Sequence, residues 1–195
     1  MSGDHSDALI SRRVRRLETL LEERGIVGGA TLDEAIDAFL SGASPANGAH
    51  VVARAWTDPD FRTRLLADAN AAVAELGYAS GGVQPQRLRV VENTDRVHNV
   101  IVCTLCSCYP LGLLGPSPGW YKSEAYRSRV VREPRAVLEE FGLTLPADTG
   151  ITVWDSTSES RYMVLPRRPA GTDGLDEKAL AALVTRNALI GTAAV

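Results

Sequence analysis

Apolar residues recur with a helical period near the start of the chain. One stripe consists of Ile10, Val14, Leu17 and Leu21, which share one face of a helix that is predicted to end at Gly25. Thr31 and Glu34 form a capping-box pattern that predicts a second, shorter helix. Residues 41–48 are rich in Gly, Ala, Ser, Pro and Asn, a composition typical of a linker. The pattern therefore predicts residues 1–48 as a helical arm with its linker.

A different pattern follows in the rest of the chain. The pair Asp58–Pro59 favours an N-cap and a first helical residue, and the apolar period after it predicts one helix up to Gly77. From Arg87 onward, short β-branched runs are typical of strands. The predicted strands are 88–91, 97–102, 151–155 and 162–165, and the predicted later helices are 134–141 and 176–184. We therefore expect an α+β fold, with a layered α/β domain over residues 49–195.

Composition narrows the class of protein. The chain has 195 residues, of which 45% are hydrophobic and 23% charged, as in an average globular protein. A net charge of −3 disfavours a general nucleic-acid binder. No apolar run approaches the ~20 residues of a membrane-spanning helix, and the N-terminus lacks the layout of a secretory signal. We expect a cytoplasmic protein that has no membrane or nucleic acid among its partners.

The three cysteines lie together in the arrangement C-x-x-C-x-C, at Cys103, Cys106 and Cys108. Clustered thiols without distant partners indicate metal or redox chemistry rather than a disulfide framework. An iron–sulfur cluster normally takes four thiolates, and a redox dithiol would leave the third thiol idle. Structural zinc needs a fourth ligand, for which His98 is the obvious candidate. However, His98 precedes Cys103 by an odd number of strand residues, which favours opposite faces of the sheet.

A further possibility uses the backbone of Cys106, Ser107 and Cys108. Two deprotonated amide nitrogens lie between the outer sulfurs, so one ion could close a six-membered and two five-membered chelate rings in a near-planar set. Cys103 could then bind axially and leave a sixth octahedral position open. Amide nitrogens lose protons only to a strongly polarising ion. This arrangement therefore favours a trivalent transition metal over zinc, which prefers a tetrahedron.

The segment Val102–Cys108 resembles the metal-binding claw of the nitrile hydratase α subunit. The similarity continues through residues 119–123, 130–135, 161–166 and 168–172, and covers essentially the whole chain. Thr104 is similar to the cobalt-type enzymes, so the resemblance implies a non-corrin Co(III), with iron(III) the weaker alternative. The implied ligands are the sulfurs of Cys103, Cys106 and Cys108 and the backbone nitrogens of Ser107 and Cys108. The family also implies that Cys106 is oxidised to a sulfinate and Cys108 to a sulfenate.

The same resemblance implies a function and partners. It indicates the α subunit of a lyase that hydrates a nitrile to the amide, with Cys108 catalytic. The expected partners are a β-type subunit, which supplies arginines to the cysteine oxygens in a hetero-oligomer, and a cobalt-insertion activator. The N-terminal arm is the natural candidate to clasp the β-type subunit. Gln84 matches an active-site glutamine of the family by spacing, although a solvated loop glutamine would look the same.

Leu111 departs from the family pattern, which commonly has a tryptophan lining the pocket there. Neutral drift in a loop would explain the change. A roomier pocket for a bulky nitrile would also explain it, as in a nucleoside-nitrile branch such as toyocamycin nitrile hydratase. Two other functions remain alternatives: the metal subunit of a thiocyanate hydrolase, and a non-catalytic zinc or metal-carrier module.

Overall fold

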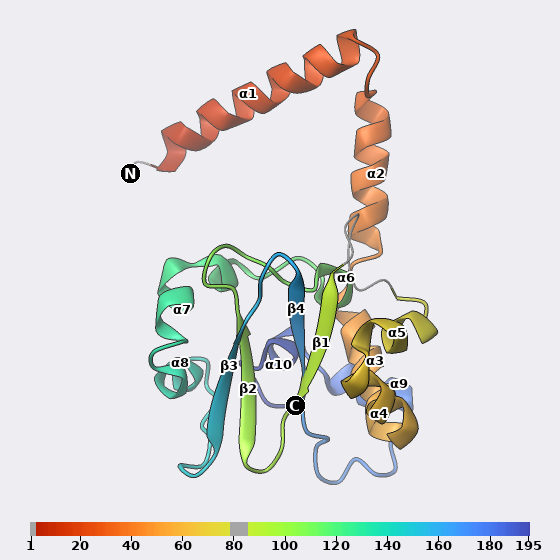
Figure 1. The fold of residues 1–195 in the computed structure, drawn as a ribbon, viewed down its shortest axis with the longest axis vertical. Coiled ribbons are helices and arrows are strands. Elements are labelled where there is room, and N and C mark those ends of the chain that lie inside the picture. The colour runs from red at the N-terminus through yellow and green to blue at the C-terminus, as the bar shows by residue number, and fades with distance from the viewer. Residues whose placement is uncertain (1–2, 79–85) are drawn as a thin grey trace. The chain divides into compact units, whose positions relative to one another are not determined.

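The computed structural model describes residues 3–78 and 86–195 (Figure 1). The chain divides into two compact units, Met1–Gly42 and Ala43–Val195. The expected mixture of helices and short strands is confirmed, with helices prevailing. No helix in the described part of the chain combines the length and the apolar content that crossing a bilayer requires.

The first unit consists of α1 (Gly3–Glu23) and α2 (Gly29–Ser41). The predicted first helix is confirmed. Its apolar stripe is exposed along α1, including Leu9, Ile10, Val14 and Leu17. The second helix begins at Gly29, so Thr31 lies inside it and the predicted capping box at Thr31 is wrong. A helix with a continuous exposed apolar face is typical of a segment that packs on another surface.

Helix α3 (Pro45–Thr57) opens the second unit and corrects the predicted linker, because Pro45–Gly48 belong to this helix. Ser44 is its N-cap, and the Ser44 hydroxyl accepts a hydrogen bond from the amide of Ala46 at 3.2 Å. The helix begins with small residues, which give little hydrophobic signal. Val51 and Val52 are nevertheless fully buried. Helix α3 is therefore a core helix that the sequence pattern did not predict.

The helix predicted after Asp58 is two helices, α4 (Pro59–Ala67) and α5 (Ala69–Glu75). Asp58 is the N-cap of α4 as predicted, and its carboxylate accepts from the amide of Phe61 at 2.8 Å. Asp68 interrupts the run with an extended backbone and caps α5 by accepting from Ala71. The apolar period continues across this break because both helices pack on the same core.

The four predicted strands are confirmed as β1 (Arg87–Glu92), β2 (Val97–Val102), β3 (Gly150–Asp155) and β4 (Ser160–Leu165). They form two parallel pairs, β1 with β4 and β2 with β3. Figure 1 shows the pairs side by side, with β2 and β3 running opposite to β1 and β4. Val102 pairs with Asp155, and Arg87 pairs with Ser160. The ends of β2 and β3 therefore lie at the edge where β1 and β4 begin.

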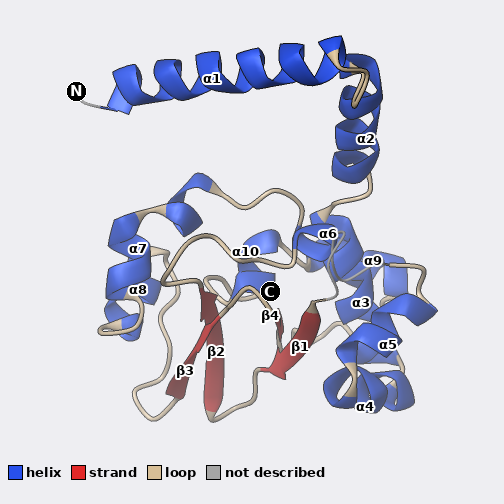
Figure 2. Cartoon of the chain, turned by 45° about the horizontal axis from the view of Figure 1, so that its top comes forward, coloured by secondary structure: helices blue, strands red, loops and turns tan. Residues whose placement is uncertain are grey.

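Helices cover the strands on both sides (Figures 1 and 2). Helices α7 (Glu124–Arg129) and α8 (Pro134–Glu140) flank β3, whereas α3, α4 and α5 lie on the side of β1. Helix α10 (Arg186–Ile190) packs on β4 and β2, and α9 (Glu177–Leu183) packs on α3. The two helices expected near residues 134 and 176 are confirmed, while α7 and α10 were not predicted. The core includes Phe61, Leu65, Ile101, Leu113, Met163 and Leu189.

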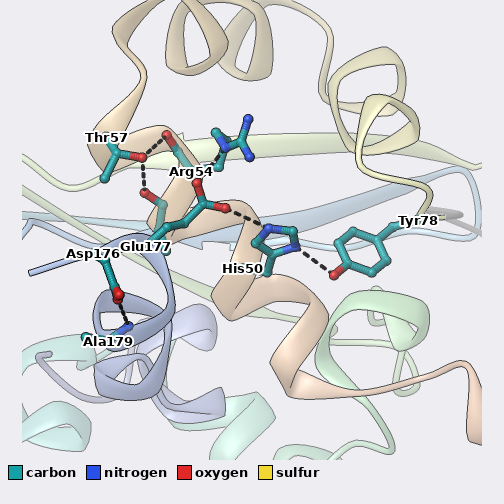
Figure 3. A network of polar contacts seen from close by, with 8 residues as sticks. His50, Arg54, Thr57, Tyr78, Asp176, Glu177 and Ala179 are labelled. Carbon is teal, nitrogen blue, oxygen red and sulfur yellow. Dashed lines mark hydrogen bonds and ion pairs between the residues drawn. The ribbon is translucent and has the colours of Figure 1, made fainter.

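A polar network joins α3 to α9 (Figure 3). Glu177 accepts from His50 Nε2 and from Arg54 Nε, each at 2.7 Å, and His50 Nδ1 lies 2.8 Å from the hydroxyl of Tyr78. The Asp176 side chain caps α9 by accepting from the amide of Ala179 at 2.7 Å. We call His50, Arg54, Tyr78 and Glu177 the α3–α9 cluster.

Candidate metal centre

The three cysteines follow β2 in a loop, residues 103–108, which we call the cysteine loop. Their sulfur atoms all lie within 4.8 Å of one another, with Cys106 Sγ at 3.4 Å from Cys103 Sγ and at 3.3 Å from Cys108 Sγ. In the described part of the chain, no other group of three His, Cys, Asp or Glu side chains converges in this way. Three convergent sulfurs are a donor set that soft or borderline transition metals prefer.

The three thiols differ in exposure. Cys103 is only 1% exposed, Cys108 is half-buried, and Cys106 is open to solvent. The Cys106 amide also donates to the sulfur of Cys103 at 3.3 Å, which turns the chain back over the buried thiol. The loop therefore holds one sulfur on the protein side and presents two outward.

The thiols also differ in acidity. Hydrogen bonds from the thiols of Cys108 and Cys103 lower the pKa of Cys106 to about 7. Burial and the hydrogen bond to Cys106 raise the pKa of Cys108. In the absence of an ion, the first thiolate in the loop is therefore on Cys106, supported by its two neighbours.

Asp155 fixes the second residue of the loop. Its carboxylate accepts from the Thr104 amide at 2.9 Å and from the Thr104 hydroxyl at 2.6 Å. The register places Asp155 beside Val102, so the end of β3 faces the residue that leaves β2. Arg127 Nη1 donates to the carbonyl of Thr104 at 3.2 Å. Thr104 is thus held through its side chain, its amide and its carbonyl.

Two buried tyrosines hold the backbone on either side of the cysteines. The Tyr121 hydroxyl donates to the carbonyl of Cys108 at 3.0 Å, and the Tyr126 hydroxyl donates to the carbonyl of Ile101 at 2.7 Å. Trp120 packs edge-on against both rings. Sequence reasoning did not assign these tyrosines a role at the site. The available signal was their place in the segment 119–126, the first part of which resembles the family.

Two arginines at the loop were also missed. Arg161, at the start of β4, is only 8% exposed, and Arg127 lies in α7. The Nε atoms of both are buried without a hydrogen-bond partner. Although burial is the larger effect and raises the pKa of Cys108, the charge of Arg161 acts in the opposite direction. The available signal for Arg161 was its place in the segment 161–166, which resembles the family, although a single charged residue at the start of a strand is normally exposed.

The structure separates His98 from the cysteines and corrects the zinc alternative that used it. His98 is buried in β2, and its Nε2 lies 2.7 Å from the carbonyl of Gly191, while Nδ1 lies 3.2 Å from Asn93. Burial lowers the pKa of His98. A side chain at Gly191 would collide with the carbonyl of Asn99, so this close approach requires glycine. His98 is a core residue.

The other predicted site residues are Ser107, Leu111 and Gln84. Ser107 lies between Cys106 and Cys108 and is exposed. Leu111 is the first residue of α6 (Leu111–Leu114) and is half-buried, directly after the cysteine loop. Gln84 lies outside the described residues. Its predicted role stays a prediction, as do the roles of Ser107 and Leu111.

Comparisons with known proteins place the chain in a family. The family model described as "Nitrile hydratase, alpha chain" matches residues 8–193. The chain belongs to this family. The cysteine cluster is thus a potential metal site in an enzyme subunit of the nitrile hydratase α type, as predicted.

Individual relatives are similar to this chain over most of their length. The cobalt-containing nitrile hydratase subunit alpha of Pseudonocardia thermophila is 54% identical over 93% of this chain and 89% of its own. The thiocyanate hydrolase subunit gamma of Thiobacillus thioparus is 45% identical over 76% of this chain and 65% of its own. A solved Fe-type nitrile hydratase from Comamonas testosteroni Ni1, a double mutant, has a TM-score of 0.88 at 44% identity, covering 96% of this chain and 90% of that one.

Proposed function

We propose that this chain is the metal-bearing α subunit of a cobalt-type nitrile hydratase, which adds water to a nitrile to give the amide. The observation that carries the proposal is the convergence of three sulfurs within 4.8 Å in a C-x-x-C-x-C loop. Relatives about half identical to this chain, from Pseudonocardia thermophila and Rhodococcus rhodochrous, are named as cobalt-containing nitrile hydratase alpha subunits. Cobalt is therefore the favoured ion, and iron(III) is the weaker alternative.

The residues present fit a trivalent metal. The sulfurs of Cys103, Cys106 and Cys108 would bind it together with the backbone nitrogens of Ser107 and Cys108, which lie between the two outer sulfurs in the sequence. A bound Co(III) would supply Lewis acidity that makes the nitrile carbon electrophilic. The clamp of Asp155 on Thr104 holds the loop in place for this purpose, as hydrogen bonds behind metal ligands generally do.

Oxidation of the cysteines is the second part of the proposal. Oxidation of a thiolate depends on its ionisation and its access to the oxidant. Cys106 is exposed and Cys108 half-buried, whereas Cys103 is buried. We expect two oxygens on Cys106 and one on Cys108, with Cys103 remaining a thiolate. Each added oxygen removes two electrons from sulfur, and dioxygen is the oxidant that would accept them.

The sulfenate oxygen of Cys108 would then act on the substrate. It either attacks the nitrile carbon itself or takes a proton from a water that attacks. One water is consumed for each amide formed, and both of its protons end on the amide nitrogen. Where the sulfenate oxygen itself attacks, it passes into the amide and the oxygen of the water replaces it on Cys108. Gln84 is proposed to assist at this site on the strength of its spacing from Cys103 alone.

A β-type subunit is the proposed partner, and a cobalt-insertion activator is proposed to load the metal. The exposed apolar face of α1 supports the first proposal, because Leu9, Ile10 and Val14 are all open to solvent in this chain. Burying such a face against a second subunit removes apolar surface from water. The arm would thereby clasp the subunit that completes the active site.

Metal analysis combined with peptide mass mapping tests this function. We expect about one cobalt per chain in protein produced with cobalt, because the loop offers one ligand set. We also expect two added oxygens on Cys106, one on Cys108 and none on Cys103. Zinc without added oxygens would support a metal-carrier module instead. Oxygens spread over all three cysteines, or found on Cys103, would contradict the proposed mechanism.

The metal subunit of a thiocyanate hydrolase is the second candidate. It is favoured by the similarity to the Thiobacillus thioparus gamma subunit. Leu111 argues against it, because a small side chain at the pocket gives room that a substrate as small as thiocyanate does not need. Comparing hydration rates for thiocyanate, acetonitrile and an aromatic nitrile separates the two functions. Turnover of thiocyanate alone would favour the hydrolase.

A further inference from the structure

Strand β1 is paired with another strand along only one of its two edges. The amide of Arg87 donates to the carbonyl of Glu159 at 2.8 Å. The amide of Asn93, just beyond the strand, donates to the carbonyl of Leu165 at 2.9 Å. Odd-numbered residues of β1 therefore direct their backbone groups to β4, and even-numbered residues such as Val90 direct theirs to the other edge. Helices α4 and α5 lie on that other side of β1 (Figures 1 and 2).

Two asparagine side chains cover the ends of the free edge of β1. Asn70, near the start of α5, accepts from the amide of Leu88 at 2.7 Å and donates to the carbonyl of Gln86 at 2.9 Å. The amide group of Asn70 thus pairs with β1 in the way that the backbone of a neighbouring strand would. At the other end, the side chain of Asn99 donates to the carbonyl of Glu92 at 2.8 Å. Only the middle of the edge remains between these two side chains.

The middle of the free edge opens into a groove, which we call the β1 groove. It has a volume of about 490 Å³ and is lined by residues 87–91 of β1 and by residues 66–69, where α4 ends and α5 begins. In the described part of the chain, the carbonyl of Leu88 and the amide and carbonyl of Val90 face this groove without a hydrogen-bond partner. Such a row of unpaired backbone groups is a template for another extended chain.

The β1 groove also carries positive charge and aromatic surface. Arg87 and Arg89 are exposed, and neither side chain forms an ion pair with any described residue. Arg89 lies beside Tyr162 in the register of β1 with β4. The ring of Tyr162 is 5.1 Å from that of Trp154, and both rings line the groove. Two guanidinium groups without a counter-charge therefore lie next to the unpaired backbone.

We propose that the β1 groove is a strand-addition site, at which an extended acidic segment of a partner protein pairs with the free edge of β1. Main-chain hydrogen bonds to Leu88 and Val90 supply the affinity, and side chains on alternate positions supply the specificity. Carboxylates of the segment lie on the face of Arg87 and Arg89, and apolar side chains lie on the face of Leu88 and Val90. The site goes beyond the proposed function, and it requires neither the metal nor oxidised cysteines.

A second copy of this chain is a poor occupant of the β1 groove. Pairing of two β1 strands at their free edges would bring Arg87 and Arg89 of both copies together, and like charges on neighbouring strands are destabilising. Charged side chains on an edge strand generally prevent such self-pairing. The same two arginines attract a segment that carries carboxylates, so charge complementarity favours an acidic partner.

A labelled hexapeptide with blocked ends, Glu-Val-Glu-Val-Glu-Val, is the probe for this site on the full chain. We expect saturable binding by fluorescence anisotropy, with a Kd below roughly 1 mM. The peptide Lys-Val-Lys-Val-Lys-Val should bind at least roughly tenfold more weakly, since its charges are repelled. Hydrogen exchange of the Val90 amide should slow roughly tenfold with the acidic peptide bound, whereas the Leu88 amide, already bonded to Asn70, should change little. No saturable binding, or equal binding of both peptides, would overturn the inference.

Methylation of the peptide backbone separates strand pairing from simple attraction between charges. In an extended peptide the N–H groups of all Glu residues point to one edge, and those of all Val residues point to the other. One acidic peptide is therefore methylated on its Glu amides and a second on its Val amides. We expect one of the two to lose at least roughly tenfold in affinity, because its hydrogen bonds to β1 are removed, and the other to bind like the parent. Equal affinities of the two methylated peptides would contradict strand addition.

Variants of the chain test the charges of the β1 groove. The double variant Arg87→Gln with Arg89→Gln should bind the acidic peptide roughly five- to tenfold more weakly, because two exposed ion pairs are lost. Arg132→Gln is the matched control, since Arg132 is also exposed but follows α7, away from β1. An equal loss in the control and the double variant would overturn the inference. So would a dimer of the free chain that the peptide dissociates, because a second copy would then be the occupant.

Discussion

The α3–α9 cluster and the cysteine loop are both polar, but they differ in how their charges are balanced. In the α3–α9 cluster, Glu177 contacts both His50 and Arg54, and the second nitrogen of His50 contacts Tyr78. At the cysteine loop, Arg127 and Arg161 each keep a buried Nε without a partner. The charged groups of the α3–α9 cluster are paired with one another, whereas the two arginines at the cysteine loop each have an Nε–H group without an acceptor.

We interpret this difference as a structural role for the α3–α9 cluster and a functional role for the cysteine loop. Buried polar groups in proteins are nearly always hydrogen-bonded, so the exceptions require an explanation. The α3–α9 cluster needs nothing further, and it joins two helices of the core unit. The cysteine loop combines spare cationic donors with three sulfurs, and both features fit an added ion with anionic ligands. The predictions below test whether the two regions behave as differently as their geometry indicates.

The largest effect is expected for Cys103→Ala. Cys103 is the buried member of the three thiols, and removing it leaves two sulfurs for the ion. We expect cobalt affinity to fall by more than roughly a hundredfold, since metal ligands contribute more than the groups behind them. Elemental mass spectrometry of protein produced with cobalt measures the bound metal. Cobalt retained at the wild-type level would contradict the assignment of the ligands.

Asp155→Ala is expected to have the next largest effect. The variant removes both hydrogen bonds that hold Thr104, without changing any sulfur. Cobalt affinity should fall roughly ten- to hundredfold, as is usual when a group supporting the ligands is lost. Competition with a chelator measures this affinity. Asp95→Ala is the control, because Asp95 forms an exposed ion pair with Arg167 and should not alter cobalt binding.

The strands and most helices could be predicted from the sequence, because their signals are local. β-branched residues mark β1, β2 and β3, a short apolar run at 162–165 marks β4, and Asp58 with Pro59 marks the start of α4. Helix α3 could not be predicted in this way, since its first turns are Ala, Gly and Asn and its burial depends on distant partners. The break at Asp68 was missed for a related reason, because the same apolar period continues in α5.

The cysteine loop could be predicted in greater detail than its surroundings. Three clustered cysteines and their spacing in the sequence predict a metal site without any tertiary information. In contrast, Asp155, Tyr121 and Arg161 reach the loop from segments remote in sequence. Asp155 is brought there by the pairing of β3 with β2, whereas Tyr121 comes from the short turn at residues 119–122 and Arg161 from the start of β4. A single sequence contains no local pattern for such contacts.

Glu177→Gln tests whether the α3–α9 cluster contributes to stability alone. The variant weakens the contacts of Glu177 with both His50 and Arg54 while keeping the size of the side chain. We expect a loss of about 1–2 kcal/mol in the free energy of unfolding, which corresponds to roughly 2–8 °C in melting temperature. Cobalt content should be unchanged.

Asp60→Asn is the control for this variant, because Asp60 is also an acidic residue in the first turn of a helix, α4. It reports the part of the effect that comes from the helix dipole alone, which is typically below about 1 kcal/mol. Calorimetry on the metal-free proteins gives both values. A loss of cobalt in Glu177→Gln would show that the α3–α9 cluster and the cysteine loop are coupled, and would break the comparison.

The smallest effect is expected for Leu111→Trp, which asks how far the functional region extends beyond the cysteines. Leu111 is half-buried at the start of α6, three residues after Cys108. If it lines the substrate pocket, the added ring removes space that only a large substrate uses. We expect kcat/KM for an aromatic nitrile to fall roughly tenfold, with a change below about twofold for acetonitrile. Equal effects on both nitriles would place Leu111 outside the pocket, and the functional region would then end with the cysteine loop.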